Sequence, residues 1–551
     1  MIRLILKIMK TILLILPMLY AFNCFSQIPE IQWQQCYGTS DTDKSYAIAG
    51  TGNGYMIATE VRTGEGLTNY HGSHDIWIIN IDTIGDIIWE KCYGGSVGEI
   101  PKKIIAISEN EYYILGTTGS TDGDVQSYHH GESDTWVVKI NGQGDILWEK
   151  CFGSSGPEET RDMILTTDGG FVLLSRIHAA GGDVSQYYGS WDNWMCKCDS
   201  LGNIEWEKTL GNEWLDSGVS MIINSEGNIM MIGAAAHYGG IVDCNADDGY
   251  GDVWLVELNL SGQIIWQRCY GGSYYDIGID IEELENGYIF VASSSSNDGD
   301  VTDHHGPGGT APDAWPDIWV VKINNSGEII WQKSLGGYDG DYAKYICTKE
   351  DSGIIVIGTT WSHDGDITNN HSVTGTYDTD LWIVKLTPEG EIEWQQCYGG
   401  WGTERLETPH TILKKDDYNY VIASSTDYGP SYDVACTPTG GNGIDRDVWI
   451  FEIDSIDTSG IIGSTFIQNS ILVYPNPAKD YVCFEYILPE DKEDVMFSIK
   501  NMQGIETANF NLHDKKGVKV WDTRDVKQGV YFYSFKRGLR ILKRGKVVII
   551  N

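Results

Sequence analysis

The chain of 551 residues is acidic and rich in glycine and aromatic residues, with 78 Asp and Glu against 38 Lys and Arg, 65 Gly, 20 Trp and 31 Tyr. A net charge of −40 repels nucleic acid and anionic lipid surfaces, so neither is expected as a partner. Turn-forming and aromatic residues in these proportions are typical of a protein built from many short strands.

The N-terminus, residues 1–26, is predicted to be a signal peptide. Arg3, Lys7 and Lys10 precede an apolar run, and small residues stand before a cleavage point between Ser26 and Gln27. The alternative is a lipoprotein signal that ends at Cys24, although the residues before this cysteine match the required small-residue box poorly. No later stretch has the ~20 apolar residues of a membrane span, so none is expected in the mature chain.

Residues 27–453 contain an internal repeat of about 60 residues with two tryptophan anchors. The first anchor is Trp, two polar residues, a small residue, an aromatic residue or Leu, and Gly; the second is Asp-x-Trp before an apolar run. Fourteen of the 20 tryptophans occupy these two positions: Trp33, Trp89, Trp148, Trp206, Trp266, Trp331 and Trp394 in the first, and Trp77, Trp136, Trp194, Trp254, Trp319, Trp382 and Trp449 in the second.

Each repeat is predicted to hold four strands, which is the pattern of a β-propeller blade. In one repeat, Asp134 begins a β-branched strand, a Gly-Gln-Gly turn leads into a second strand, and two further strands flank the turn at Asp168. Taking the Asp-x-Trp strand as the first of each unit, the chain starts at a second strand, residues 31–37, and ends its repeats with an unpaired first strand, residues 447–453. Pairing these two strands would complete a blade from both termini and remove the exposed edges.

These units resemble the seven-bladed β-propeller repeats of many exported bacterial proteins, in Asp-x-Trp-Val-Val-Lys-Ile, Gly-x-Ile-x-Trp-x-Lys and Asp-Gly-Gly-aromatic pieces. The predicted fold is all-β, a seven-bladed β-propeller with merged first and last blades, followed by a C-terminal immunoglobulin-like β-sandwich. Fold alone says little about activity, since propellers bind, scaffold and catalyse.

The cysteines do not look like a disulfide framework. Cys36, Cys92, Cys151, Cys269 and Cys397 occupy one repeated position, replaced by Thr209 and Ser334 in the other two repeats. We therefore expect small buried core residues, each in its own blade.

The connections between strands are expected to place two loop families on one face, where a propeller binds partners. One family is Gly-Gly-Ser-x-x-Asp and the other is Asp-Gly-Asp-Val or its variant. Carboxylates of the second family are candidate Ca²⁺ ligands, although the loops lack a complete ligand set and tight turns explain them equally. The candidates are Asp122, Asp124, Asp298, Asp300, Asp364 and Asp366.

No catalytic or cofactor-binding residue is predicted. The sequence has no nucleophile elbow, no His-Glu-x-x-His motif and no phosphate-binding loop. The pairs His129-His130 and His304-His305 suggest a transition-metal site, but adjacent histidines seldom point at one ion. Apart from Ca²⁺, no cofactor is expected.

The C-terminal part differs in charge from the repeats. Residues 474–551 hold 14 Lys and Arg against 10 Asp and Glu, whereas residues 27–473 hold 21 against 68. We take residues 454–470 as a linker and residues 471–551 as a separate domain. Its strands are predicted at residues 481–486, 495–499, 518–521, 530–535 and 546–550.

This domain resembles the type A sorting domain of the type IX secretion system of Bacteroidetes. The matching pieces are Tyr474, Pro475, Asn476 and Pro477 at its start, the segment ending at Gly504, the segment containing Gly529 and Tyr531, and the terminal run of residues 543–550. The resemblance implies export through the periplasm to the surface or the medium, with the type IX machinery as a partner of this domain.

Three functions follow as alternatives. The leading hypothesis is a non-catalytic binding or scaffold propeller, secreted or on the cell surface, whose loop face takes an unknown extracellular protein or glycan. The others are an extracellular glycan-binding protein and a propeller hydrolase or lyase. Aromatic side chains in a shared pocket would favour the glycan, and convergent carboxylates and histidines at the ring centre with a bound cation would favour the enzyme.

Overall fold

A computed structural model describes residues 29–243, 250–306, 315–349, 352–454 and 471–549, with short gaps inside the last two ranges. The chain divides into two compact units, one ending at Ile456 and the other beginning at Asp457. The described part has no helix with the length and hydropathy of a membrane span.

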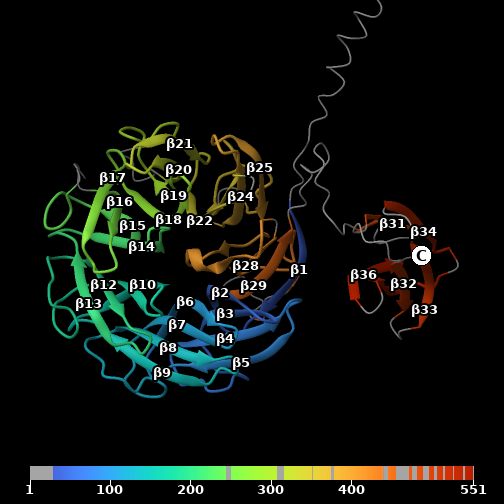
Figure 1. Ribbon diagram of the computed structural model, residues 1–551, viewed down its shortest axis with the longest axis horizontal. Coiled ribbons are helices and arrows are strands. Elements are labelled where there is room, and N and C mark those ends of the chain that lie inside the picture. Colours follow the sequence, from blue (N-terminus) through green and yellow to red (C-terminus); the bar gives the residue numbers. More distant parts are fainter. Residues whose placement is uncertain are drawn as a thin grey trace, which may run out of the picture. The chain divides into compact units, whose positions relative to one another are not determined.

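The first unit is a ring of seven β-sheets, the blades, each built from antiparallel strands (Figure 1). From the ring centre outward, blade 1 is β2 (Lys44–Thr51), β3 (Gly54–Val61), β4 (Asp75–Asp82) and β5 (Ile87–Tyr93). Blade 2 is β6 (Glu99–Ser108), β7 (Glu111–Thr118), β8 (Asp134–Asn141) and β9 (Ile146–Phe152). Blade 3 is β10 (Glu158–Leu165), β11 (Phe171–Ile177), β12 (Asp192–Cys198) and β13 (Ile204–Leu210).

The next three blades repeat this order. Blade 4 is β14 (Asp216–Ile223), β15 (Ile229–Ala235), β16 (Asp252–Leu258) and β17 (Ile264–Tyr270). Blade 5 is β18 (Asp276–Leu284), β19 (Gly287–Ser294), β20 (Asp317–Asn324) and β21 (Ile329–Leu335). Blade 6 is β22 (Asp341–Thr348), β23 (Ile354–Thr360), β24 (Asp380–Leu386) and β25 (Ile392–Tyr398).

Blade 7 is made from both ends of the repeat region, which confirms the predicted closure. Its strands are β26 (Glu404–Arg405) and β27 (Ile412–Lys414) at the centre, joined through the 3-10 helix η1 (Pro409–Thr411), then β28 (Asn419–Thr426), β29 (Asp447–Asp454) and β1 (Glu30–Tyr37). Strand β1 pairs antiparallel with β29, from Glu30 opposite Asp454 to Tyr37 opposite Val448.

The blades begin two strands earlier than expected. The Asp-x-Trp strand is the third from the centre, and the Trp-anchored strand is the outermost. The periodic pattern alone could not fix this frame, because a cyclic repeat has the same order wherever counting starts. A shift of two strands leaves each connection on its expected face.

The two tryptophan positions hold the strands and the blades together. In the third strand, Trp136 Nε1 donates to Glu149 on the outermost strand at 2.8 Å, and Trp319 Nε1 donates to Gln332 at 2.7 Å. In the outermost strand, Trp206 Nε1 donates to the Leu260 carbonyl of the next blade at 2.8 Å. These indoles therefore satisfy their one polar group while filling the core, whereas the buried Nε1 of Trp77 in blade 1 has no hydrogen-bond partner among the described residues.

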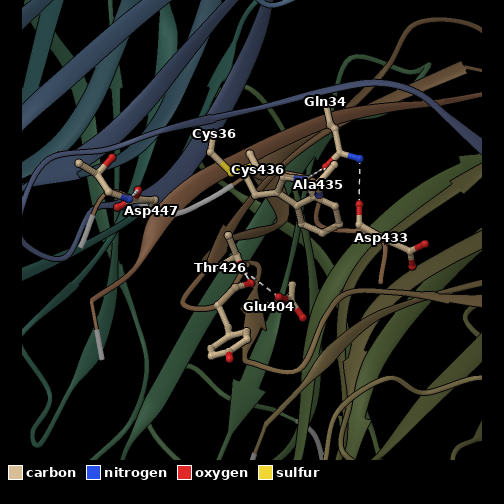
Figure 2. Close-up of a disulfide and its surroundings, with 11 residues drawn as sticks. Gln34, Cys36, Glu404, Thr426, Asp433, Ala435, Cys436 and Asp447 are labelled. Atoms are coloured by element: carbon tan, nitrogen blue, oxygen red, sulfur yellow. Dashed lines mark hydrogen bonds between the residues drawn. A yellow bond between two sulfur atoms is a disulfide. The ribbon is translucent and has the colours of Figure 1, made fainter. Parts of the chain in front are cut away.

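A disulfide between Cys36 and Cys436 fastens the closing strand, so the expectation of free core cysteines is wrong at Cys36 (Figure 2). Gln34 adds to this clamp, because its amide nitrogen donates to the Asp433 carbonyl at 2.8 Å and its amide oxygen accepts from the Ala435 backbone at 2.8 Å. Cys269 is also disulfide-bonded, so the expectation is wrong there too. Cys92, Cys151 and Cys397 are free and buried as expected.

The second unit is a small β-sandwich, as predicted. One sheet is β30 (Ile471–Tyr474), β31 (Tyr481–Ile487) and β34 (Lys516–Asp522), and the other is β33 (Glu506–Leu512), β32 (Val495–Asn501), β35 (Gly529–Arg537) and β36 (Arg540–Ile549). Phe484 of the first sheet packs against Phe497 of the second, with ring centroids 4.5 Å apart. Strand β33, which is rich in polar residues, was not anticipated.

The disulfide predicts that ring closure depends on oxidation. Replacing Cys36 and Cys436 together by serine should lower the free energy of unfolding by about 2–5 kcal/mol, because the cross-link joins residues 400 positions apart. Thermal unfolding of the oxidised proteins measures this loss. Cys92→Ser, at the equivalent free position of blade 1, is the control; an equal loss in both proteins would contradict a role of the cross-link in closure.

Candidate functional site

The candidate site lies on the face where the innermost strands begin, which we call the loop face. The connections between blades and those between the second and third strands of each blade both emerge here. They touch one another, because the Ser96 backbone donates to Asp122 at 2.7 Å and the Tyr338 backbone donates to Asp364 at 2.8 Å. The two loop families of the sequence therefore form one surface.

Six innermost strands carry a one-residue β-bulge at equivalent places, three residues after the first residue of the strand in five of them and two residues after it in β2. A bulge redirects side chains, and these strands surround the ring centre (Figure 1). Three of the six bulged residues are basic and only partly buried. The six are Tyr46, Lys102, Arg161, Val219, Ile279 and Lys344.

Glu159 and Glu407 lie among these cations, while Glu60, whose charge also reaches Lys102, is already paired with Lys44 and Arg62. Positive charge is therefore in excess. Glu159 accepts from both Arg161, at 3.1 Å, and Arg176, at 3.0 Å. Glu407 of blade 7 lies 3.7 Å from Arg446. We call Lys102, Arg161, Arg176, Lys344, Arg405, Glu159 and Glu407 the cationic belt.

Two lysines of the cationic belt have no ion pair within the described residues. Lys102 Nζ lies 5.5 Å from the ring centroid of Tyr46, and no hydrogen bond holds Lys344 in the described part of the chain. Burial lowers the pKa of both ammonium groups. A charge kept from water without a partner is costly, so these groups are stabilised least of all the charges at the ring centre.

One residue deeper lies a second polar cluster. Lys103 Nζ donates to Asp162 Oδ1 at 2.7 Å, His410 Nε2 lies 3.1 Å from the same oxygen, and the Met221 backbone donates to Oδ2 at 2.8 Å. Although burial acts to raise it, the pKa of Asp162 is held well below its usual range by Lys103 and His410. Burial raises the pKa of nearby Asp280 to about 7.

His410 reaches this cluster because blade 7 has an insertion. Sixteen residues separate Glu404 from Tyr420, against thirteen between Glu158 and Phe171 at the equivalent places in blade 3. The extra residues break the innermost strand and form η1. The longer spacing in this repeat is the sequence signal that could have predicted the insertion.

Exposed aromatic side chains gather on the loop face. Within the described propeller, nine aromatic residues are at least 40% exposed, and all nine lie on connections of this face: Tyr128, Trp214, Tyr238, Tyr250, Tyr275, Tyr338, Trp401, Tyr428 and Tyr432. Trp401 packs edge-on to Tyr432 with centroids 6.1 Å apart. On the opposite face the exposed apolar residues are aliphatic, such as Leu201.

The predicted calcium ligands hold loops in place. Asp298 accepts from the Ser273 backbone at 2.7 Å and hydroxyl at 2.6 Å. Asp122 and Asp364 make the backbone contacts given above, and Asp124, Asp300 and Asp366 receive weaker backbone hydrogen bonds from Gly94, Gly271 and Gly336. Among the described residues, no three His, Cys, Asp or Glu side chains are grouped to hold a metal ion. Calcium binding stays a prediction.

The paired histidines bind carboxylates instead of converging on a metal. His129 and His130 both approach Asp134, at 3.9 and 3.2 Å, and His304 and His305 both approach Asp317, at 3.0 and 2.9 Å. These aspartates belong to the Asp-x-Trp motif, so the loop is fastened to the strand that follows it.

Each of these aspartates faces the buried carboxylate that begins the next innermost strand. Over Gly153, a Cβ would lie 2.2 Å from Glu158 Oε2 and 2.9 Å from Asp134 Oδ1, so only glycine fits beneath this pair. The Asp192–Asp216 pair sits in the same way over Gly211. The inward oxygens Glu158 Oε2, Asp192 Oδ1 and Asp216 Oδ1 are buried without a hydrogen-bond partner in the described structure.

Two buried carboxylates that approach the same glycine disfavour ionisation of both, so each pair favours keeping a proton. Burial raises the pKa of Asp216 to about 8, of Glu158 to about 8 and of Asp192 to about 6. The pairs therefore connect the two loop families through contacts whose strength depends on protonation.

Some residues of the sequence predictions fall outside the described structure. Ser26, Gln27, Pro475, Asn476, Pro477 and Gly504 are among them. Tyr474 ends β30 and Gly529 begins β35. Tyr531 is buried, and its hydroxyl donates to the Lys527 carbonyl at 2.8 Å.

The architecture thus defines a seven-bladed β-propeller joined to a small β-sandwich. Residues 472–550, which cover the sandwich, match the secretion system C-terminal sorting domain family. The protein is accordingly a Bacteroidetes-type secreted or cell-surface propeller that engages the type IX secretion system. No protein with curated annotation matches the sequence.

Solved structures with similar architecture are remote. A puromycin hydrolase is 10% identical over 82% of this chain, with a TM-score of 0.41, and the chain spans 60% of its length. A PL25 ulvan lyase is 10% identical over 76% of this chain and 96% of its own, with a TM-score of 0.44. PorZ, a surface component of the type IX secretion system of Porphyromonas gingivalis, is 10% identical over 92% and 75%, with a TM-score of 0.25. Such likenesses do not indicate a substrate.

The sorting domain predicts where a truncated protein accumulates. In a bacterium with type IX secretion, the full chain should reach the surface or medium, and a chain lacking residues 474–551 should stay in the periplasm because it lacks the recognised domain. Immunoblots of cell fractions measure this. Equal distribution of both chains would contradict the assignment.

The carboxylate pairs predict that the propeller loses stability as pH rises. The folded state keeps protons up to about pH 6–8 that the unfolded chain releases near pH 4, so the free energy of unfolding falls between these values, on the order of 2 kcal/mol per pair. Thermal unfolding at pH 5 to 9 measures the slope.

Asp216→Asn tests one pair. The amide keeps the bond from the Asn212 backbone and can donate to Asp192, so the variant should lose less stability with rising pH than the native protein. Asp216→Ala removes the acceptor of the Asn212 backbone N–H, so its free energy of unfolding should be lower than that of the native protein at every pH. A native pH slope in Asp216→Asn would show that the pair holds no proton.

Proposed function

We propose that the protein is a non-catalytic binding module that takes an extracellular ligand on the loop face of its propeller. One observation carries this proposal: all nine strongly exposed aromatic side chains of the described propeller lie on that face. Exposed Trp and Tyr cost free energy in water and supply rigid contact area when covered, which is why they concentrate at binding surfaces. Export to the cell exterior brings this face to extracellular partners.

A glycan is the favoured ligand over a protein surface. Sugar rings stack on aromatic faces, and the aromatics here stand on separate loops around a ring rather than in one flat apolar patch. Polar groups between them, such as Arg176 under Trp191 at 4.8 Å, offer hydrogen bonds that a sugar uses and an apolar protein surface does not.

A propeller hydrolase or lyase is the alternative, because Asp162, His410 and Lys103 converge at the ring centre. The contacts of Asp162 weigh against it as a base, since both carboxylate oxygens already accept from protein groups. Within the described residues, Lys102 and Lys344 of the belt have no ion pair, and such cations suit binding of an acidic ligand better than removal of its protons.

The proposal predicts that binding is lost with loop-face aromatics. A glycan array probed with the mature chain identifies the ligand, and Trp401→Ala with Tyr432→Ala should weaken its binding about tenfold or more, because stacked aromatics dominate such contacts. Leu201→Ala on the opposite face is the matched control. Equal loss in the control would contradict the proposal, and cleavage of the bound glycan would establish the enzyme instead.

A further inference from the structure

We propose that the cationic belt binds the carboxylate or sulfate group of an acidic glycan; this rests on the proposed binding function of the loop face. The belt combines five cations with two carboxylates at the ring centre of a propeller that is otherwise strongly acidic. Its charged groups come from blades 2, 3, 6 and 7, so they meet only in the closed ring.

One side of the belt has the parts of a sugar-acid site. Arg161 and Arg176 share a single oxygen of Glu159, at 3.1 and 3.0 Å, and the Nε of each arginine is buried without an acceptor in the described structure. Guanidinium groups bind carboxylate and sulfate through two parallel donors. Because the two guanidinium groups share one carboxylate, their joint charge is only half neutralised, and this favours a second anion beside them.

Aromatic rings flank these arginines. Trp191 lies over the Arg176 guanidinium at 4.8 Å, and Tyr275, which is 40% exposed, has its pKa raised by burial of the hydroxyl and pulled down by Arg176 and Arg161 nearby. A pyranose ring stacked on an aromatic face places its equatorial acid group at the edge of the ring, where the guanidinium donors are. This favours an acidic sugar over an acidic peptide.

The other side is formed by the two unpaired lysines. Glu407 is the one carboxylate of the belt whose charge reaches both Lys102 and Lys344, and it already lies 3.7 Å from Arg446. An incoming anion would form the ion pair that each ammonium group lacks among the described residues. Because the ammonium groups are partly desolvated beforehand, that contact is stronger than at an open surface.

The charge of the rest of the propeller limits the kind of anion. A propeller with 66 acidic and 21 basic residues in 27–453 repels a long polyanion, whereas the belt attracts a single acid group at short range. The fitting ligand is a glycan with few acid groups or one that presents a terminal uronic acid or sulfate.

Binding is tested with the mature full chain and small probes. Titration calorimetry with trigalacturonic acid, a sulfated chondroitin disaccharide, maltotriose and triglutamate compares carboxylate, sulfate, neutral sugar and acidic peptide. We expect binding of one or both acidic sugars and none of maltotriose. In Lys102→Met with Lys344→Met, affinity should fall about tenfold for each lysine.

The matched control is Lys333→Met on the outermost strand β21, which makes the same charge change far from the ring centre. It should leave binding unchanged. The belt variant should fold at least as stably as the native chain, because it removes buried unpaired charges, and its unfolding temperature shows this.

The outcomes separate the two proposals. A preference for trigalacturonic acid or for the sulfated disaccharide supports the belt and identifies the acid group. If maltotriose binds as tightly as the acidic sugars and the lysine changes do not affect it, the cationic belt does not bind an acid group. The proposal of glycan binding by the loop face then still holds. Tighter binding of triglutamate than of the acidic sugars overturns the proposal that the ligand is a glycan. If no probe binds and the loop-face aromatic variants change no binding on the array, both proposals fail.

Discussion

The pairing of β1 with β29 is the contact on which the rest of the molecule depends. A propeller blade has an outer edge, and only a closed ring gives each blade a neighbour on both sides. Here the closing strand comes from the opposite end of the repeat region, so the ring as a whole is complete only when residues 400 positions apart have met. The disulfide at Cys36 and the amide of Gln34 act at this seam because local sequence contacts cannot hold it.

The number of blades and the pairing of β1 with β29 could be predicted from the sequence, but the disulfide that fastens this pairing could not. The tryptophan spacing gives the number of units, and the missing strand at each end gives their pairing. Cys36 was misjudged because it shares its column with free cysteines in other blades. The distinguishing signal was the second cysteine in Val434-Ala-Cys436, which recurs only as Val242-Asp-Cys244, in the blade of the disulfide-bonded Cys269.

The cationic belt could not be predicted from the sequence, for a physical reason. Lys102, Arg161 and Lys344 occupy a bulge, and a bulge breaks the two-residue alternation from which inward and outward positions are inferred. Their neighbours in space belong to other blades. A repeat alignment could have shown basic residues at one column of three units, but not that the ring brings this column together.

The charged groups of the propeller fall into two sets, the buried carboxylate pairs and the cations of the ring centre. Between the loop families, burial raises the pKa of paired carboxylates such as Asp192 and Asp216, which favours a proton over a second negative charge in each pair. At the centre, Lys103 is paired with Asp162, and Arg161 and Arg176 share Glu159, but Lys102 and Lys344 have no ion pair among the described residues. This contrast between neutralised loop carboxylates and unpaired central lysines, more than the net charge of the chain, is the reason to look for an anionic ligand at the centre.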